Sequence, residues 1–578
     1  MNTIADLNDD RLDSQEVQIA QNGVDIPDTV EPERSRLDLW STIAARGGGI
    51  ARMSLVVAQA TTNLAFQTAK ASTRLGLGIA REVVKTVAPV GIDKFIDVAE
   101  FFAILGIEIG EGVTHLSLSG SSELVRVLQQ FFGDKKSLLM AYEIVQLLSR
   151  ELVNTGVHLN MYEVWKYFSA WISMQNKTKL LWRDEFIWSS VVEYNRNDHL
   201  AIENLELESP GQLVTANQSL PQLDPVLLLS TLRRYSRFAN AIYGERVMTY
   251  LEGDNALFTA HYDDKHFYAH YAGIDFTDIR YLSRLDQPMD FFEVGYVPAF
   301  CVSMDHEKKA VVLAFRGTIS AKDTIVDLYC EAMHLSLSGS DELYYLHGGM
   351  LKVVTDVSNP DNKLGVYHKV KQALEDFPEY SLVITGHSLG AGLASILGMA
   401  WADPVTCQLK PDIGFRPCEV KVYAFACPSI METKLALQGV NLITTVAMGW
   451  DWLARISYDS VIEIRDAIVR LKSLSLDEPT LISELLSTET PTDDRLADFY
   501  RVRREISLNH LPDQSTSFKL HPPGRIIWLY FSQTDLDRFT FYDVYNRANV
   551  FGEILFDDNS LNDHYPTRYD QVLESMEF

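Results

Sequence analysis

The most constraining feature of this sequence is a serine between two glycines that follows an apolar stretch. Residues 380–398 read YSLVITGHSLGAGLASILG, in which Gly386, Ser388 and Gly390 fit the pattern G-x-S-x-G. Where a buried strand turns sharply into a helix, the residues two positions before and after the serine must be small, because strand and helix approach closely there. Serine and glycine are also common in ordinary turns. The strand-like SLVIT and the small residues that follow Gly390 nevertheless favour a nucleophile at Ser388.

The sequence around this motif alternates between strand-like and helix-like segments. Short β-rich runs lie at 299–305, 309–317, 380–386 and 420–428, and helical patterns separate the later ones. Such alternation is typical of a largely parallel sheet covered by helices on both faces. The sequence therefore predicts an α/β domain. A chain of 578 residues is longer than one hydrophobic core usually serves, so we also expect a second region.

A serine hydroxyl needs a general base, and on this type of sheet the chain order is serine, then an acid, then histidine. Three histidines follow Ser388. His510 lies in a polar, charged stretch, and His521 begins the rigid turn HPPGR. His564 follows the apolar VFGEILF and heads a loop near the C-terminus. We therefore predict His564 as the base.

The remaining parts of the predicted site are an acid and two oxyanion donors. Asp451 comes directly after the apolar run LITTVAMGW, as expected of a triad acid at a strand end, although it could instead cap the next helix. Leu389 follows the nucleophile, and Thr318 follows a strand that ends at a glycine, so their backbone N–H groups are the predicted oxyanion donors. His387 belongs to the turn, and its side chain is expected to point away from the reacting serine.

Composition and charge exclude some classes of function. The formal net charge of -27 argues against non-specific nucleic-acid binding, which needs clustered Lys and Arg. The five cysteines are scattered without CxxC spacing, so we expect a reducing compartment. No secretory signal and no apolar run long enough to span a bilayer are visible. The sequence therefore predicts a cytoplasmic protein that is not secreted.

The chain divides into four parts by composition. Residues 1–40 are acidic and polar and are predicted to be a disordered leader. Residues 41–207 are expected to be mainly helical, 208–225 have the Pro, Gly, Ser and Asn content of a linker, and 226–578 contain the serine motif. Within the second part, 41–91 carry six basic residues and one acid among apolar residues at roughly helical spacing. That stretch suits an amphipathic helix on a membrane or lipid-droplet surface, or equally a helix packed on its neighbours.

About 113 positions separate the predicted acid from the predicted base, more than one strand and one helix need. The segment 471–518 between them is polar and rich in acids. We interpret 471–518 as an insertion near the mouth of the site, and hypothesise that it is a mobile regulatory flap.

The ordered motifs AFRGTISAKDTIVDL, HGGM, ITGHSLGAGLA, AFACPS, PPGR and SLNDHYP resemble those of class 3 lipases, and most closely the sn-1-specific diacylglycerol lipases. The resemblance covers roughly residues 226–578. It implies an α/β-hydrolase fold, a triad of Ser388, Asp451 and His564, and an oxyanion hole at Thr318 and Leu389. The four membrane-spanning helices that precede the catalytic domain in the animal enzymes have no counterpart in this sequence.

Together, these features predict a serine lipase that hydrolyses an acyl ester of a neutral glycerolipid, with diacylglycerol as the substrate that the resemblance implies. Phospholipase A1 or triacylglycerol lipase activity is the nearest alternative, because pocket shape rather than the triad selects the head group. A catalytically inactive protein that binds lipid surfaces is the alternative from another class. The mechanism needs no cofactor and no metal, and no HExxH, EF-hand or P-loop motif is present.

Overall fold

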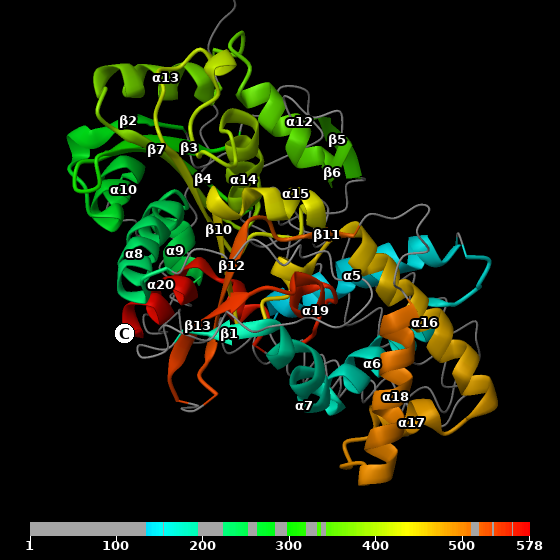
Figure 1. Ribbon diagram of the computed structural model, residues 1–578. Helices are drawn as coiled ribbons and strands as arrows, with labels where there is room; N and C mark the ends of the chain where they lie inside the picture. Colours follow the sequence, from blue (N-terminus) through cyan, green and yellow to red (C-terminus); the bar gives the residue numbers. More distant parts are fainter. Residues whose placement is uncertain are drawn as a thin grey trace, which may run out of the picture.

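The computed structural model describes most of the chain from residue 135 onward (Figure 1). The described residues are 135–153, 155–194, 223–251, 263–283, 298–318, 332–336, 343–363, 365–509, 519–533, 537–557 and 559–578. The predicted leader, the basic stretch 41–91 and most of the predicted linker lie outside these ranges.

A nine-stranded sheet forms the centre of the molecule (Figure 1). The four pairings β4–β7, β7–β8, β8–β10 and β10–β12 are parallel, and the strands beyond them at both edges are antiparallel. This mostly parallel sheet with flanking helices is the predicted α/β-hydrolase fold. In sheet order the strands are β1 (Val191–Glu193), β13 (Phe539–Val544), β12 (Arg525–Phe531), β10 (Ile443–Met448), β8 (Val420–Phe425), β7 (Ser381–His387), β4 (Ala310–Phe315), β3 (Phe300–Asp305) and β2 (Ile279–Leu282).

The four predicted β-rich runs correspond to β3, β4, β7 and β8, and each strand begins within one residue of the predicted start. These strands were recognisable because parallel strands are buried on both faces and read as continuous apolar runs. In β4, for example, all six residues are buried. Val311 and Leu313 face one core while Ala310 and Val312 face the other.

Helices cover both faces of the sheet (Figure 1). One face packs against a group of helices that includes the C-terminal one: α8 (Pro225–Ala241), α9 (Glu245–Leu251), α10 (Asp264–Ala272) and α20 (Pro566–Ser575). The other face packs against α12 (Gly348–Val357), α13 (Val366–Asp376) and α14 (Leu389–Trp401). The first residue of α8 is Pro225, and Asp224 caps this helix by accepting from Val226 N at 2.9 Å, so the predicted linker ends slightly earlier than expected.

The helices of the N-terminal region extend the same core beyond the sheet. Helices α5 (Lys135–Val153) and α6 (Met161–Lys177) bury side chains such as Trp165 and Phe168 in the core that also contains the sheet residues. Strand β1 pairs antiparallel with β13 and becomes the edge of the nine-stranded sheet. The described part of the predicted N-terminal region is therefore continuous with the α/β domain, a packing that no local sequence pattern could indicate.

The predicted insertion is helical over its described part. It contains the end of α16 (Tyr458–Asp477), α17 (Leu481–Leu486) and α18 (Asp493–Asn509), and residues 510–518 lie outside the described ranges. In α18, Phe499, Val502 and Ile506 are buried at helical spacing although the surrounding sequence is highly charged. These helices were not predicted from the sequence, because the overall polarity of the segment hides one narrow apolar stripe. Their packing gives the segment a structural role that a mobile flap would not have.

Smaller elements complete the described fold. A four-stranded sheet contains β11 (Leu520–His521), β9 (Met431–Glu432), β6 (Leu343–His347) and β5 (Ala332–Ser336). The short helices are α7 (Lys179–Trp182), α15 (Thr433–Gln438) and α19 (Arg547–Phe551). A π-helical turn is η2 (Arg183–Ile187), and the 3₁₀ turns are η3 (Trp188–Ser190), η4 (Phe276–Asp278), η5 (Pro411–Ile413), η6 (Gly439–Asn441), η7 (Leu453–Arg455) and η8 (Asn562–His564). Within the described ranges, none of the helices combines the length and apolar character needed to cross a bilayer.

Candidate active site

Ser388 lies at the sharp turn between β7 and α14. Its backbone has φ 58° and ψ -125°, a conformation that costs energy for any residue with a side chain. A Cβ atom on Gly386 would lie 2.4 Å from the carbonyl carbon of Gly390, and one on Gly390 would lie 2.2 Å from Phe315 O. Both glycines are therefore required by close backbone contact, as the G-x-S-x-G pattern predicts.

The structure brings the three predicted triad residues into one chain of hydrogen-bond contacts. His564 Nε2 lies 3.0 Å from Ser388 Oγ, and His564 Nδ1 lies 3.0 Å and 3.1 Å from Asp451 Oδ2 and Oδ1. All three side chains are buried, with exposed fractions of 3%, 8% and 1% for Ser388, His564 and Asp451. This arrangement allows His564 to accept the serine proton while Asp451 orients the imidazole.

Two further groups hold the carboxylate of Asp451. Leu453 N donates to Oδ1 at 2.9 Å, so Asp451 also stabilises the turn η7. Asp451 therefore caps this turn and contacts His564 at the same time. Tyr569 donates its hydroxyl to Oδ2 at 3.2 Å. Burial, followed by the charge of Asp451, raises the pKa of Tyr569 well above its usual value, so this hydroxyl remains a donor. Tyr569 was not predicted from the sequence, because nothing in its local sequence indicates that α20 lies next to Asp451.

The hydrogen-bond partners of the His387 side chain are Tyr243 and the backbone of His564. His387 Nε2 lies 2.8 Å from the backbone carbonyl oxygen of His564, and its Nδ1 lies 3.0 Å from the hydroxyl of Tyr243. A carbonyl oxygen only accepts, so Nε2 carries the proton and Nδ1 accepts from tyrosine. Burial, followed by the proximity of His564, lowers the pKa of His387 well below its usual value. His387 is therefore a neutral positioning group.

The two predicted oxyanion donors lie on either side of the turn. Leu389 is the first residue of α14, so its N–H has no acceptor within the helix. A Cβ atom on Gly317 would lie 2.5 Å from His387 O and 3.2 Å from Ser388 Cβ, so the end of β4 abuts the serine turn. Thr318 follows directly and is partly exposed. The backbone N–H groups of Leu389 and Thr318 thus come from the two elements that meet at Ser388.

A buried arginine lies close to the acid. Arg455 is 1% exposed, and its guanidinium nitrogens have no hydrogen-bond partner among the described residues. Its Cζ lies 4.9 Å from the ring centroid of Phe551, a cation–π contact. Burial lowers the pKa of Arg455 to about 10, and the carboxylates of Asp451 and Glu553 oppose that effect. The positive charge is therefore balanced by nearby acids rather than by paired hydrogen bonds.

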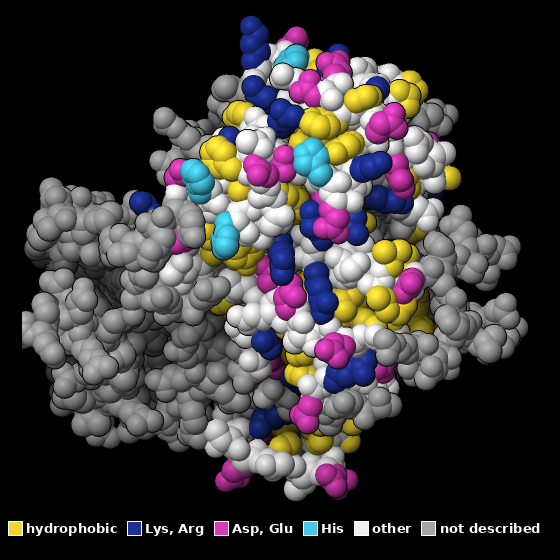
Figure 2. Space-filling view, turned by 90° about the vertical axis from the view of Figure 1, so that its left-hand side faces the viewer, with side chains coloured by type: hydrophobic (Ala, Val, Ile, Leu, Met, Phe, Trp, Pro, Cys, Tyr) yellow, Lys and Arg dark blue, Asp and Glu magenta, His cyan; other side chains and the backbone are white. Residues whose placement is uncertain are grey.

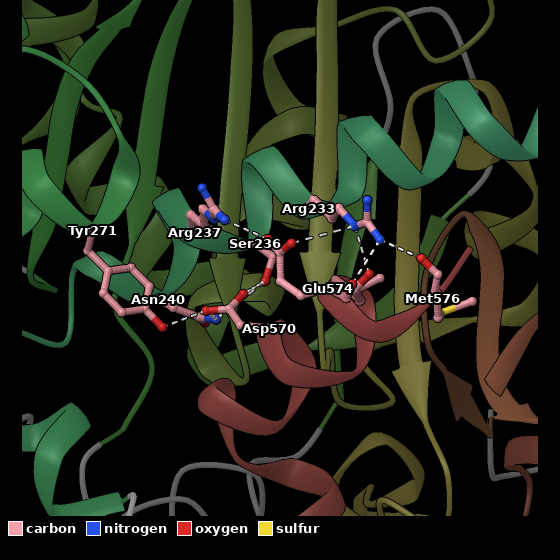
Figure 3. Close-up of polar contacts among 9 residues, drawn as sticks. Arg233, Ser236, Arg237, Asn240, Tyr271, Asp570, Glu574 and Met576 are labelled. Atoms are coloured by element: carbon pink, nitrogen blue, oxygen red, sulfur yellow. Dashed lines mark hydrogen bonds and ion pairs between the residues drawn. The ribbon is translucent and has the colours of Figure 1, made fainter. Parts of the chain in front are cut away.

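Helix α20, which follows His564, is fastened to α8 by polar contacts (Figure 3). The partly buried carboxyl of Asp570 accepts from Asn240 Nδ2 at 2.8 Å and from the Tyr271 hydroxyl at 2.6 Å, and it also contacts Ser236. Asn240 Nδ2 additionally donates to Pro566 O at 3.0 Å, two residues after His564. These contacts fix the backbone that leads away from the base.

The other candidates do not join this group. His521 is buried on β11 in the smaller sheet, and His510 lies outside the described residues. In the described part of the chain, no cluster of three or more His, Cys, Asp or Glu residues could hold a metal ion. The face that carries α8 and α10 shows acidic and basic side chains interspersed rather than gathered by sign (Figure 2).

Comparison with known proteins assigns the centre of this domain to a family. Residues 312–461 match the model of the family described as lipase (class 3). The chain carries a class 3 lipase domain. The matched residues include Thr318, Ser388, Leu389 and Asp451, whereas His564 lies beyond them.

The class 3 lipase domain resembles curated relatives over part of their length. Human diacylglycerol lipase-alpha is 26% identical over 290 residues, which are 47% of this chain and 26% of the relative. Mouse diacylglycerol lipase-beta is 28% identical over 200 residues, 34% of this chain and 27% of the relative. The match thus spans about a quarter of these relatives. A solved Rhizomucor miehei lipase is 16% identical with a TM-score of 0.33, and the alignment covers 60% of this chain and 82% of that structure.

Proposed function

We propose that this protein is a serine lipase that hydrolyses an acyl ester of a neutral glycerolipid, with diacylglycerol as the substrate. The observation that carries the proposal is the buried hydrogen-bond chain from Ser388 through His564 to Asp451. The strained backbone of Ser388 and the two N–H groups beside it support the same conclusion, because acyl transfer needs an activated nucleophile and an oxyanion site.

In the first half of the reaction, Ser388 Oγ attacks the ester carbonyl carbon and its proton passes to His564 Nε2. The carbonyl oxygen becomes an oxyanion, which the backbone N–H groups of Leu389 and Thr318 stabilise. Asp451 stabilises the imidazolium that forms. The bond between the acyl carbon and the glycerol oxygen then breaks, and His564 returns the proton to the leaving oxygen, so that an acyl-serine remains.

In the second half, water attacks the acyl-serine. His564 takes one proton from the water as its oxygen bonds to the acyl carbon. Collapse of the second oxyanion releases the fatty acid, and the proton returns to Ser388 Oγ. The products are one fatty acid and a glycerolipid that has one acyl chain fewer, and the protein regains its starting state.

The substrate class rests on the similarity to relatives that include diacylglycerol lipases. Phospholipase A1 and triacylglycerol lipase activities use the same triad and differ in the pocket around the glycerol. Hydrolysis rates of purified protein on diacylglycerol, triacylglycerol and phosphatidylcholine, compared at equal lipid surface, test the assignment. The fastest turnover is expected on diacylglycerol; a higher rate on either of the other lipids contradicts it.

Labelling by a fluorophosphonate probe tests the catalytic roles. Wild type should be labelled, Ser388→Ala should not, and His564→Ala and Asp451→Ala should label at least about a hundredfold more slowly, because the triad members act as a unit. Equal labelling of wild type and Ser388→Ala would exclude Ser388 as the nucleophile. A folded wild type that neither labels nor turns over any of the three lipids favours the inactive lipid-surface protein instead.

We further propose that the protein acts on the cytoplasmic side at membrane or lipid-droplet surfaces, through the basic stretch 41–91. This stretch lies outside the described residues, and the proposal rests on its sequence. Six basic residues against one acid, in a chain of net charge -27, favour attachment to anionic lipid head groups.

A further inference from the structure

The base His564 lies on a turn, and the segment that leads into this turn is held by elements far away in the sequence. Residues 553–557 run between α19 and the turn η8, which ends at His564. The position of residues 553–557 depends on contacts with other elements, because the segment itself belongs to neither a helix nor a strand. A displacement here would move His564 away from the serine.

Gln175 of α6 holds this segment by its backbone. The side chain is buried, with 2% exposed. Its Nε2 donates to Ile554 O at 2.9 Å, and its Oε1 accepts from Phe556 N at 3.3 Å. One amide side chain therefore satisfies a donor and an acceptor two residues apart, as a neighbouring β-strand would.

An acid and an arginine complete the same contact region. Gln175 Nε2 also donates to Glu553 Oε1 at 2.8 Å. Arg503 of α18 donates to Glu553 Oε2 at 3.2 Å, to Gln175 O at 3.2 Å and to Thr178 Oγ1 at 3.1 Å. Arg503 is 1% exposed and its Cζ lies 4.2 Å from the ring centroid of Trp182. The predicted insertion is thereby tied to the N-terminal helices and to the base segment at one buried point.

The same segment also contacts the turn of the acid. The ring of Phe556 lies 5.5 Å from that of Phe168 on α6 and 5.8 Å from that of Trp452, the residue after Asp451. Lys179 of α7 forms an ion pair with Asp557 and lies 4.4 Å from the ring centroid of Trp450, the residue before Asp451. Helices α6 and α7 therefore reach the segment of the base and the turn of the acid together.

We infer that Gln175 is a positioning residue for catalysis: together with Arg503 and Glu553 it keeps the segment 553–557 in place, so that His564 stays within hydrogen-bond distance of Ser388 and Asp451. This inference rests on the proposed hydrolase function. It makes the N-terminal helices and the insertion parts of the active-site scaffold rather than accessory regions. Small displacements of a base cost much rate, because proton transfer requires close and aligned atoms.

The variant Gln175→Met tests the inference in the full-length protein, since methionine keeps the volume and removes all three hydrogen bonds. Ser173→Ala is the matched control: Ser173 lies on the same helix, is also buried, and bonds to Leu485 O on α17 instead of the base segment. Turnover of 4-nitrophenyl butyrate should show kcat about tenfold lower for Gln175→Met with KM within about twofold. Ser173→Ala should retain both values even if its melting temperature falls.

Hydrogen exchange of the peptide that spans 553–564 gives a readout independent of activity. It should accelerate in Gln175→Met and remain at the wild-type rate in Ser173→Ala. Wild-type kcat together with wild-type exchange in Gln175→Met would overturn the inference while leaving the proposed function intact. An inactive wild type would instead refute the proposed function, and the exchange experiment would still decide whether Gln175 holds the segment.

If Gln175→Met cannot be obtained folded, Arg503→Lys tests the same contact region from α18. Lysine keeps the charge, but its single ammonium nitrogen cannot replace both the Nη1 contacts to Gln175 O and Thr178 Oγ1 and the Nη2 contact to Glu553. We expect a smaller fall in kcat with the same acceleration of exchange at 553–564. Unchanged values for both measurements in Arg503→Lys would reject the inference.

Discussion

Asp563, the residue before the base, is a buried carboxyl that the proposed reaction does not use. It accepts from Trp450 N at 2.9 Å and so holds the turn that carries Asp451. Gly449 makes this possible, because a Cβ atom there would lie 2.1 Å from Asp563 Oδ2 and its φ is 50°. Burial, reinforced by the charges of Asp451 and Asp557, raises the pKa of Asp563 to about 7.

This raised pKa makes stability depend on pH. The folded state binds the Asp563 proton more tightly than the unfolded state, so the resulting stabilisation is complete below the usual pKa of 3.8 and is lost as pH rises through about 7. Asp563→Asn removes this dependence and keeps an acceptor for Trp450 N. Between pH 5 and pH 8, wild type should lose about 2.5 kcal/mol of unfolding free energy relative to the variant. Urea unfolding at several pH values measures it.

The control for this experiment is Asp361→Asn, at an exposed position in the segment between α12 and α13. Its unfolding free energy should follow the wild-type curve at every pH. A constant difference between wild type and Asp563→Asn from pH 5 to pH 8 would mean that Asp563 is ionised in the folded protein throughout this range.

At the scale of elements, α8 acts as the support on which the C-terminal helix is fixed (Figure 3). Arg233 of α8 donates to the last carbonyl groups of α20: Nε to Leu573 O at 2.7 Å and Nη2 to Glu574 O at 3.1 Å, with a further contact to Met576 O. Carbonyl groups at a helix end have no partner within the helix, so a cation there is stabilising. Arg237, one turn later, forms an exposed ion pair with Glu574 and no other ion pair with the described residues.

These two arginines give a matched pair of variants. Arg233→Met should lower the unfolding free energy by about 1–3 kcal/mol, because several partly buried carbonyl groups lose a charged donor. Arg237→Met should change it by less than about 0.5 kcal/mol, as is usual for an exposed ion pair. Urea unfolding at pH 7 compares the two. Equal effects would show that Arg233 contributes no more than a surface charge does.

At the scale of the whole molecule, the described core begins at α5 and includes the N-terminal helices as fully as the sheet. Trp165, Phe168 and Ile172 of α6 are buried with α16 and α14 residues in one cluster. Exposing side chains of this size costs about 1.5–3 kcal/mol each, and a domain has a total stability of only about 5–15 kcal/mol. The class 3 lipase domain of this chain should therefore not fold without α5, α6 and β1.

Two truncations test this conclusion and the proposed lipid attachment together. Removal of residues 1–194 should abolish soluble expression and probe labelling, because it deletes α5, α6 and β1. Removal of 1–91 should leave turnover of 4-nitrophenyl butyrate within about twofold of wild type, since it spares every described element. The shorter truncation should also lose flotation with anionic vesicles, which in wild type should weaken as salt rises. Full flotation after removal of 1–91 assigns attachment elsewhere.

How far the sequence predicts this protein depends on the range of the interactions involved. The turn at Ser388 was predictable because its requirements are local: a buried strand, two glycines in backbone contact and small residues on the next helix. The contact between Asp451 and His564, 113 positions apart, was predictable because chain order limits the candidates to residues after Ser388 and local context separates His564 from His510 and His521. The strands were predictable because each is buried on both faces.

The tertiary structure alone decided which elements support those residues. The hydroxyl of Tyr569 reaches Asp451 across 118 positions, and the amide of Gln175 reaches Ile554 across 379. Neither contact can be recognised from the periodicity or composition of the sequence, because a single buried polar residue cannot be distinguished from a surface residue by its sequence neighbours. The helices of the insertion were missed for a related reason: a narrow apolar stripe identifies a buried face only when its partner, here α6, is known. The backbone requirements of a turn are met by adjacent residues, so the sequence alone determines them. The partners of buried polar groups depend on packing between distant segments, so only the tertiary structure decides them.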